Sequence, residues 1–299
     1  MKKLFTIALL PILFSCSDAA GDDSGISKEE INLNIATFNI RLSTTDDVGV
    51  RSWEARRSSI VAVIRDNDMD VVGFQEVLEN QQEDLKALLP EYSFYFAGRD
   101  DGTKGEAVGV AYRNSRFQPL NYLCFWLSPT PDTPSNASGW GGHPTRKRVA
   151  AVCRLVENSS HKQFYYLVTH METGGTYSGA RTKSAELILE RERLLNVNGL
   201  PSFVAGDMNT TYPDEESMEV FRTVFSDTFR EADDKGVRQG PMGTFNGFDP
   251  EADLDNELVM LDYVFAKGDY TLNSYKVIDT RYDGQYPSDH LPIVISVTM

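Results

Sequence analysis

Basic residues are scarce in this 299-residue sequence, and neither an internal repeat nor an interdomain linker interrupts it. The 29 Lys and Arg residues are outnumbered by 44 Asp and Glu residues, which gives a formal net charge of −15. A surface this acidic repels polyanions, and the sequence has no basic stripe with interleaved aromatic residues. Long nucleic acid is therefore a poor candidate partner. Without repeats or linkers, residues 31–299 are expected to form one large domain.

The sequence begins with only a short apolar run. Residues 4–15 follow a basic start and are too few to remain in a membrane as a span, so residues 1–15 are predicted to be a secretory signal. The run ends in Leu13-Phe14-Ser15-Cys16, which resembles a bacterial lipobox, in which the cysteine is lipidated. Ordinary cleavage nearby is the alternative. We expect an exported protein that is anchored to a bacterial membrane through acyl chains on Cys16.

The segment after Cys16 is rich in small and charged residues. Residues 16–30 are therefore predicted to be a flexible tether. Removal of residues 1–15 would take away Lys2 and Lys3 and move the formal charge from −15 to −17.

Short apolar runs with β-branched and aromatic residues predict most of the regular structure as strands. The expected strands cover residues 33–40, 71–76, 92–97, 107–112, 117–127, 149–156, 163–169, 201–205, 260–266 and 291–297. Helical spacing of apolar residues predicts helices at 54–65, 85–89, 178–195 and 215–225. Residues 128–148 are rich in Pro, Ser and Gly and are expected to form a long surface loop. Together these segments predict an α+β domain of two packed sheets with outer helices.

Two cysteines remain within the predicted domain. Cys124 and Cys153 lie in two expected strands. A disulfide is compatible with an exported protein, and two free buried thiols are the alternative, because pairing cannot be read from sequence.

Polar residues follow many of the apolar runs. A single Asn or Asp at a strand end commonly caps a turn, and a Glu there commonly starts a helix. Six strand ends that all carry acids, amides or imidazoles are difficult to explain by turn chemistry alone. These residues are Asn39, Glu76, His170, Asp207 with Asn209, Asp262, and Asp289 with His290.

These strand-end motifs resemble those of the endonuclease/exonuclease/phosphatase superfamily, the metal-dependent phosphoesterases related to pancreatic deoxyribonuclease. The resemblance covers nearly the whole predicted domain and implies a four-layer α/β-β/α sandwich with two mainly antiparallel sheets. The sequence also resembles the secreted bacterial lipoprotein branch of this superfamily. This resemblance rests on Trp126-Leu127-Ser128, Trp140 and Ala180-Arg181. The motifs run in order through Thr37-Phe38-Asn39-Ile40-Arg41, Phe74-Gln75-Glu76-Val77, Thr169-His170, Gly206-Asp207-Met208-Asn209, Leu261-Asp262-Tyr263 and Ser288-Asp289-His290.

The resemblance implies a site for Mg²⁺ or Mn²⁺. Glu76 would be the main carboxylate ligand, with Asn39 and Asp289 close to the metal, since hard cations of this kind take oxygen ligands. Asp207 would position or deprotonate the attacking water, and Asn209 would hold the phosphate.

The resemblance also implies roles for three further polar residues. His290 would sit beside the scissile phosphate as a base or as a cationic stabiliser, with Asp289 fixing its tautomer. Asp262 would support this histidine or a second metal position. His170 would hydrogen-bond a non-bridging oxygen and stabilise charge in the transition state.

The sequence departs from the family pattern after His170. Relatives in this branch usually continue with one residue, then Asp and His, whereas this chain has Met171, Glu172 and Thr173. Glu172 keeps the negative charge, but the second histidine is missing. Among the arginines, Arg41 and Arg181 are the candidate phosphate-binding residues.

The sequence thus predicts a divalent-metal-dependent hydrolase of phosphomonoesters or phosphodiesters. The expected substrates are small-molecule or lipid phosphoesters, and the protein is expected to be a monomer. Two alternatives stay open: a nuclease, and a non-catalytic surface-binding lipoprotein with the same fold.

Overall fold

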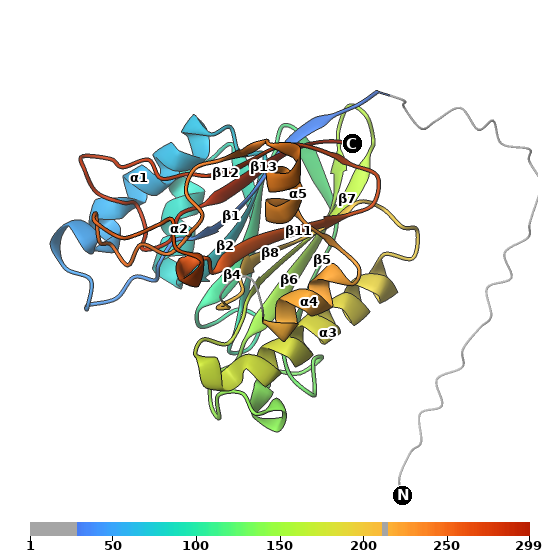
Figure 1. Cartoon of the computed structure of the whole chain (residues 1–299), viewed down its shortest axis with the longest axis horizontal. Coiled ribbons are helices and arrows are strands. Elements are labelled where there is room, and N and C mark those ends of the chain that lie inside the picture. The colour runs from blue at the N-terminus through green and yellow to red at the C-terminus, as the bar shows by residue number, and fades with distance from the viewer. Residues whose placement is uncertain (1–28, 211–214) are drawn as a thin grey trace, which may run out of the picture.

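The computed structural model describes residues 29–210 and 215–299. The predicted signal, the predicted lipidation site Cys16 and the predicted tether up to residue 28 lie outside this part. Two β-sheets form the centre of the domain (Figure 1). One sheet has seven strands in the order β10-β12-β13-β1-β2-β4-β3, and the other has six in the order β5-β6-β7-β8-β11-β9. Neighbouring strands are parallel in the pairs β1–β2, β7–β8 and β10–β12, and the other pairs are antiparallel.

The strands are short and the helices lie between them in the chain. The strands are β1 Asn32–Asn39, β2 Val71–Val77, β3 Tyr92–Gly98, β4 Ala107–Arg113, β5 Phe117–Trp126, β6 Val149–Glu157, β7 Gln163–His170, β8 Ser202–Asp207, β9 Ser226–Asp227, β10 Arg238–Gln239, β11 Asp262–Lys267, β12 Thr271–Val277 and β13 Ile293–Thr298. The helices are α1 Trp53–Asp66, α2 Glu79–Leu88, α3 Ser178–Leu195, α4 Glu216–Arg222 and α5 Thr228–Lys235. No helix in the described ranges is both long and apolar enough to cross a membrane.

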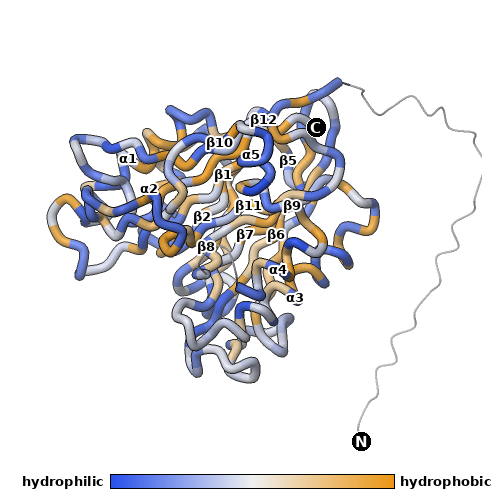
Figure 2. Tube along the Cα trace, viewed as in Figure 1, coloured by the Kyte–Doolittle hydropathy of each residue, from blue (hydrophilic) through white to orange (hydrophobic). Residues whose placement is uncertain are grey.

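Helices cover the outer faces of the two sheets. Figure 1 places α1 and α2 beside the seven-stranded sheet and α3 and α4 beside the six-stranded sheet. The apolar stripe of α1, which includes Ile60, Val63 and Ile64, is buried against β1 and β2 in one hydrophobic cluster. A larger cluster fills the space between the sheets and extends under α3. Figure 2 shows the apolar residues concentrated along the central strands and the polar ones on the outer loops. The predicted four-layer sandwich is confirmed.

The structure also corrects and completes the predicted elements. The strands expected from apolar runs are present, but sequence patterns missed α5 and β12, whose polar residues conceal their buried positions. Residues 128–148 form the expected long connection, with a 3₁₀ turn at Ala137–Trp140. Trp140 packs partly buried against the main core. Cys124 and Cys153 are free thiols, which settles the alternative that the sequence left open.

Strand directions gather the polar strand ends at one edge of the sandwich. The parallel strands β1 and β2 end at this edge, and so do the parallel strands β7 and β8. Strands β11 and β13 run antiparallel to their neighbours and therefore begin there. Gly206, near the end of β8, has φ +147°, and a Cβ atom at this position would collide with the carbonyl oxygen of Thr169 on β7. Glycine thus lets β8 lie close to β7 beside the polar edge.

Candidate active site

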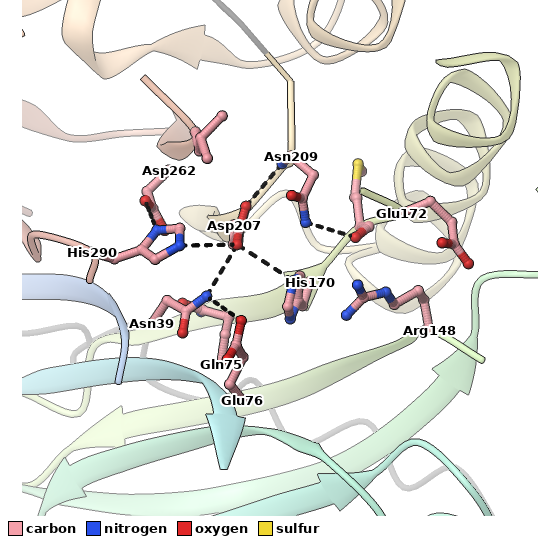
Figure 3. Close-up of polar contacts among 12 residues, drawn as sticks. Asn39, Gln75, Glu76, Arg148, His170, Glu172, Asp207, Asn209, Asp262 and His290 are labelled. Carbon is pink, nitrogen blue, oxygen red and sulfur yellow. Dashed lines mark hydrogen bonds and ion pairs between the residues drawn. The ribbon is translucent and has the colours of Figure 1, made fainter. Parts of the chain in front are cut away.

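Asp207 lies at the centre of the polar edge (Figure 3). Its Oδ2 atom accepts a hydrogen bond from Asn39 Nδ2 at 3.1 Å, and its Oδ1 atom accepts one from the Asn209 backbone N–H at 2.9 Å. His170 Nε2 and His290 Nε2 lie 3.4 and 3.8 Å from Oδ2. Three segments that are distant from Asp207 in the sequence therefore converge on its buried carboxylate.

The surroundings of Asp207 disfavour its charge. Burial is the main cause, and the nearby carboxylates of Asp262 and Glu76 add to it, whereas His290 acts in the opposite direction. Together these effects raise the pKa of Asp207 to about 7. A carboxylate with a pKa near neutrality is suited to accept and release a proton.

His290 is paired with Asp262. Burial lowers the pKa of His290, but the carboxylates of Asp262, Asp207 and Asp289 outweigh burial and hold this pKa well above its ordinary value. Its Nδ1 atom lies 2.8 Å from Asp262 Oδ2, and both side chains are buried. The imidazole is therefore held as a cation whose Nε2 faces Asp207.

The predicted partner of His290 was the wrong aspartate. Asp289 is its neighbour in the chain, but the two side chains, which lie in the segment before β13, have different partners. The Asp289 carboxylate instead accepts a hydrogen bond from Ser288 Oγ at 3.2 Å and lies 3.8 Å from Arg41 Nη1. Burial, more than any other cause, raises the pKa of Asp289. Asp262, rather than Asp289, pairs with His290 and orients its ring, which agrees with one of the two roles predicted for Asp262.

Glu76 lies beside Asn39 at the end of β2. Its Oε1 atom accepts a hydrogen bond from Asn39 Nδ2 at 3.1 Å, and its Oε2 atom accepts one from the Leu42 backbone N–H at 3.1 Å. Glu76 has φ +63°, a strained conformation for a residue with a side chain. Such strain is maintained where the surrounding structure requires a particular side-chain direction.

The residues around Asp207 fit a divalent cation. Possible ligand atoms lie within 4.8 Å of one another in two overlapping groups, Glu76 with His170 and Asp207, and Asp207 with Asp262 and His290. Several carboxylates share this small buried volume, and in the described part of the chain Asp262 Oδ1 has no hydrogen-bond partner. A hard cation with oxygen ligands would offset this concentrated negative charge.

His170 is buried next to a carboxylate that the sequence reasoning missed. Burial, and then the charges of Arg148, His290, Arg99 and Arg146, lower the pKa of His170 well below its ordinary value, so the imidazole is neutral. Its Nδ1 atom lies 3.6 Å from Glu106 Oε1. The sequence motifs follow apolar runs, whereas Glu106 precedes the apolar run of β4. Because β4 is antiparallel to β2, its start lies at the same edge as the end of β2.

Asn209 and the two candidate phosphate-binding arginines have different surroundings. The Nδ2 atom of Asn209 donates to the Met171 carbonyl at 3.0 Å, which fixes its amide beside Asp207. Arg41 lies at the edge of the cluster and donates to Asp47 through Nε at 2.9 Å.

Arg181 is not a phosphate ligand in this structure. Its buried guanidinium donates to both Glu215 carboxylate oxygens, at 2.6 and 2.9 Å, and to the carbonyl oxygens of Glu172 and Gly174. The prediction for Arg181 is wrong, because these partners occupy the guanidinium in the interior.

The chain therefore combines a two-sheet sandwich with a buried cluster of His and Asp side chains at one edge, which is the architecture of a phosphoesterase. The model of the Endonuclease/Exonuclease/phosphatase family matches residues 36–290, and the chain belongs to this family. It is similar to solved structures from Bacteroides, over almost their whole lengths. A family protein of Bacteroides vulgatus is 31% identical with a TM-score of 0.80, and the match covers 89% of this chain and 98% of that protein.

Two further similarities come from Bacteroides thetaiotaomicron. A family protein is 28% identical with a TM-score of 0.81, and the match covers 91% of this chain and 99% of that protein. A mannosyl-6-phosphatase is 28% identical with a TM-score of 0.78, and the match covers 89% of this chain and 99% of that enzyme.

Proposed function

We propose that this protein is a divalent-metal-dependent phosphatase that hydrolyses small phosphomonoesters, sugar phosphates among them. The observation that carries the proposal is the cluster around Asp207, in which a neutral imidazole, a cationic imidazole and several carboxylates converge at distances of 2.8 to 3.8 Å. The similarity to a mannosyl-6-phosphatase over nearly its whole length supports a sugar phosphate as substrate.

Glu76, supported by Asn39, would hold Mg²⁺ or Mn²⁺ together with Asp207. When bound, the cation would neutralise charge on the phosphate oxygens. Asp207 would take a proton from the attacking water.

The two histidines would act on the phosphoryl group itself. His290, kept cationic by Asp262, would stabilise negative charge on the phosphoryl group through Nε2. Neutral His170 would use Nε2 to donate a hydrogen bond to a non-bridging oxygen, and Asn209 would orient the same group.

The test is phosphate release by the purified domain over residues 29–299. Sugar 6-phosphates, p-nitrophenyl phosphate and bis-p-nitrophenyl phosphate would be compared with Mg²⁺, with Mn²⁺ and in excess EDTA. Metal-dependent release that is lost in His290→Asn supports the proposal. Absence of turnover on every compound would favour the non-catalytic lipoprotein, and preferential cleavage of plasmid DNA would favour the nuclease.

We also propose export and lipid anchoring through Cys16, supported by the lipobox-like sequence. The measurement is incorporation of labelled fatty acid and fractionation of full-length protein expressed in a bacterium. Wild type should be labelled and recovered with membranes, whereas Cys16→Ala should be unlabelled. Equal recovery of both proteins in the soluble fraction contradicts anchoring.

A further inference from the structure

A chain of alternating charges lies on the far side of His170 from Asp207. It consists of Arg99, Glu106, Arg148, Glu172 and Arg146 and is called the charge chain below. Arg99 Nη1 and Arg148 Nη1 lie 2.8 and 3.3 Å from Glu106 Oε1, and Arg146 Nη1 lies 3.3 Å from Glu172 Oε2. Three cations face two anions, so this side of the site carries a positive charge within an acidic protein.

The inner and outer members of the charge chain differ in exposure. The Arg148 side chain is 6% exposed and that of Glu172 is 2% exposed, whereas Arg146 is 28% exposed. Among the described residues, the Arg146 guanidinium makes one hydrogen bond, which Nη1 donates to Glu172 Oε2. Its remaining N–H groups are therefore available to a ligand.

Arg146 is also fixed through its backbone. Its N–H donates to His143 Nδ1 at 3.0 Å, and the His143 ring packs edge-on against Tyr177 at 6.0 Å between ring centres. The carbonyl oxygen of Glu172 accepts a hydrogen bond from buried Arg181 at 2.7 Å. Both members of the Arg146–Glu172 pair are thus held by groups outside the pair, which reduces the entropy lost when a ligand binds.

We propose that Arg146 is a substrate-binding residue that selects phosphomonoester dianions over phosphodiesters, and that Glu172 is the positioning residue that holds it. This inference rests on the proposed function. A monoester presents one more charged terminal oxygen than a diester, and a guanidinium binds such oxygens through charge-assisted hydrogen bonds. Glu172 holds its carboxylate 3.3 Å from Arg146 Nη1 and so fixes the guanidinium.

The first experiment compares Arg146→Met with Arg191→Met in the domain over residues 29–299. Arg191 is a matched control, because its side chain is 26% exposed and pairs with Asp132 at 2.9 Å, outside the charge chain. Arg146→Met should lower kcat/KM for p-nitrophenyl phosphate about tenfold or more, mainly through KM, and change that for bis-p-nitrophenyl phosphate less than threefold. Arg191→Met should change neither. Equal losses on the two substrates, or no loss, would overturn the proposal.

The second experiment tests the positioning role through Glu172→Gln and the double variant. If Glu172 acts through Arg146, Glu172→Gln should raise KM for the monoester, and the double variant should match Arg146→Met alone. Losses that multiply would show that Glu172 acts independently of Arg146.

A binding measurement keeps the inference separate from the proposed function. Calorimetric titration of inorganic phosphate in the presence of Mg²⁺ needs no turnover. Weaker phosphate binding by Arg146→Met, with Arg191→Met like wild type, supports phosphate binding by Arg146 even if no substrate is hydrolysed. Unchanged phosphate affinity in Arg146→Met contradicts it even in an active phosphatase.

Discussion

The substitution Asp262→Asn tests whether His290 works as a buried cation. Asp262 Oδ2 lies 2.8 Å from His290 Nδ1, and the two side chains are 1% and 5% exposed. Asparagine keeps the size of the side chain but removes the charge that stabilises the imidazolium. Opposite unit charges about 4 Å apart attract by about 4 kcal/mol at an effective dielectric constant of about 20.

This magnitude sets the expected loss of activity. Since about 1.4 kcal/mol corresponds to a factor of ten in rate, losing the whole interaction would lower kcat by about 10³-fold. Asp207 and Asp289 still raise the pKa of His290 in the variant, so the expected loss is about 10²- to 10³-fold.

The pH profile gives a second readout with a defined direction. The wild-type pKa of His290 is raised, so the cationic form persists through neutral pH and is lost only as the pH rises through that value. Without the Asp262 charge, the pKa falls, and the alkaline decline of kcat should begin at lower pH. The assay is initial-rate phosphate release from p-nitrophenyl phosphate with saturating Mg²⁺, across pH 5 to 10.

Asp227→Asn is the control for loss of a buried aspartate. Asp227 is 6% exposed, and its carboxylate pairs with Arg222 at 2.8 Å away from the site. This control should lower the melting temperature and leave kcat and its pH profile unchanged. A kcat for Asp262→Asn within threefold of wild type, with the same alkaline limb, would refute the role of His290.

Three further predictions concern the metal, pH-dependent stability and the buried arginine. Glu76→Gln or excess EDTA should abolish most phosphate release, because an amide binds a hard cation weakly, and full activity in EDTA would contradict the metal assignment. The pKa of Asp207 is raised from 3.8 to about 7, because the folded protein disfavours the charged carboxylate. The free energy of unfolding of the metal-free protein should therefore fall by up to about 4 kcal/mol as the pH rises between these two values. Asp207→Asn should therefore melt higher than metal-free wild type at pH 8, with a smaller difference at pH 5, and an equal difference at both pH values would contradict this. Arg181→Met should cost about 3 to 5 kcal/mol by leaving Glu215 without its buried partner, seen as a lower melting temperature; a large loss of kcat/KM with unchanged stability would instead restore Arg181 as a phosphate ligand.

Local sequence patterns were sufficient to predict most of the strands and the residues at their ends. An apolar run followed by Asn39, Glu76 or Asp207 is recognisable in the sequence, because a buried strand and its end produce a pattern within a few residues. The elements that were missed have weaker sequence patterns. Strand β12 alternates exposed and buried residues over a mostly polar sequence, and α5 is short and highly charged.

Side-chain partners depended on the tertiary structure. Sequence adjacency suggested Asp289 as the partner of His290, yet Asp262, 28 residues earlier, holds the imidazole because β11 and β13 both begin at the same edge. Glu106 reaches this edge because β4 is antiparallel to β2. The sequence by itself determined which kinds of side chain stand at the strand ends, because that information is local. Only the packing of the two sheets decided which of them touch, because strand direction and register bring together residues that are far apart in the chain.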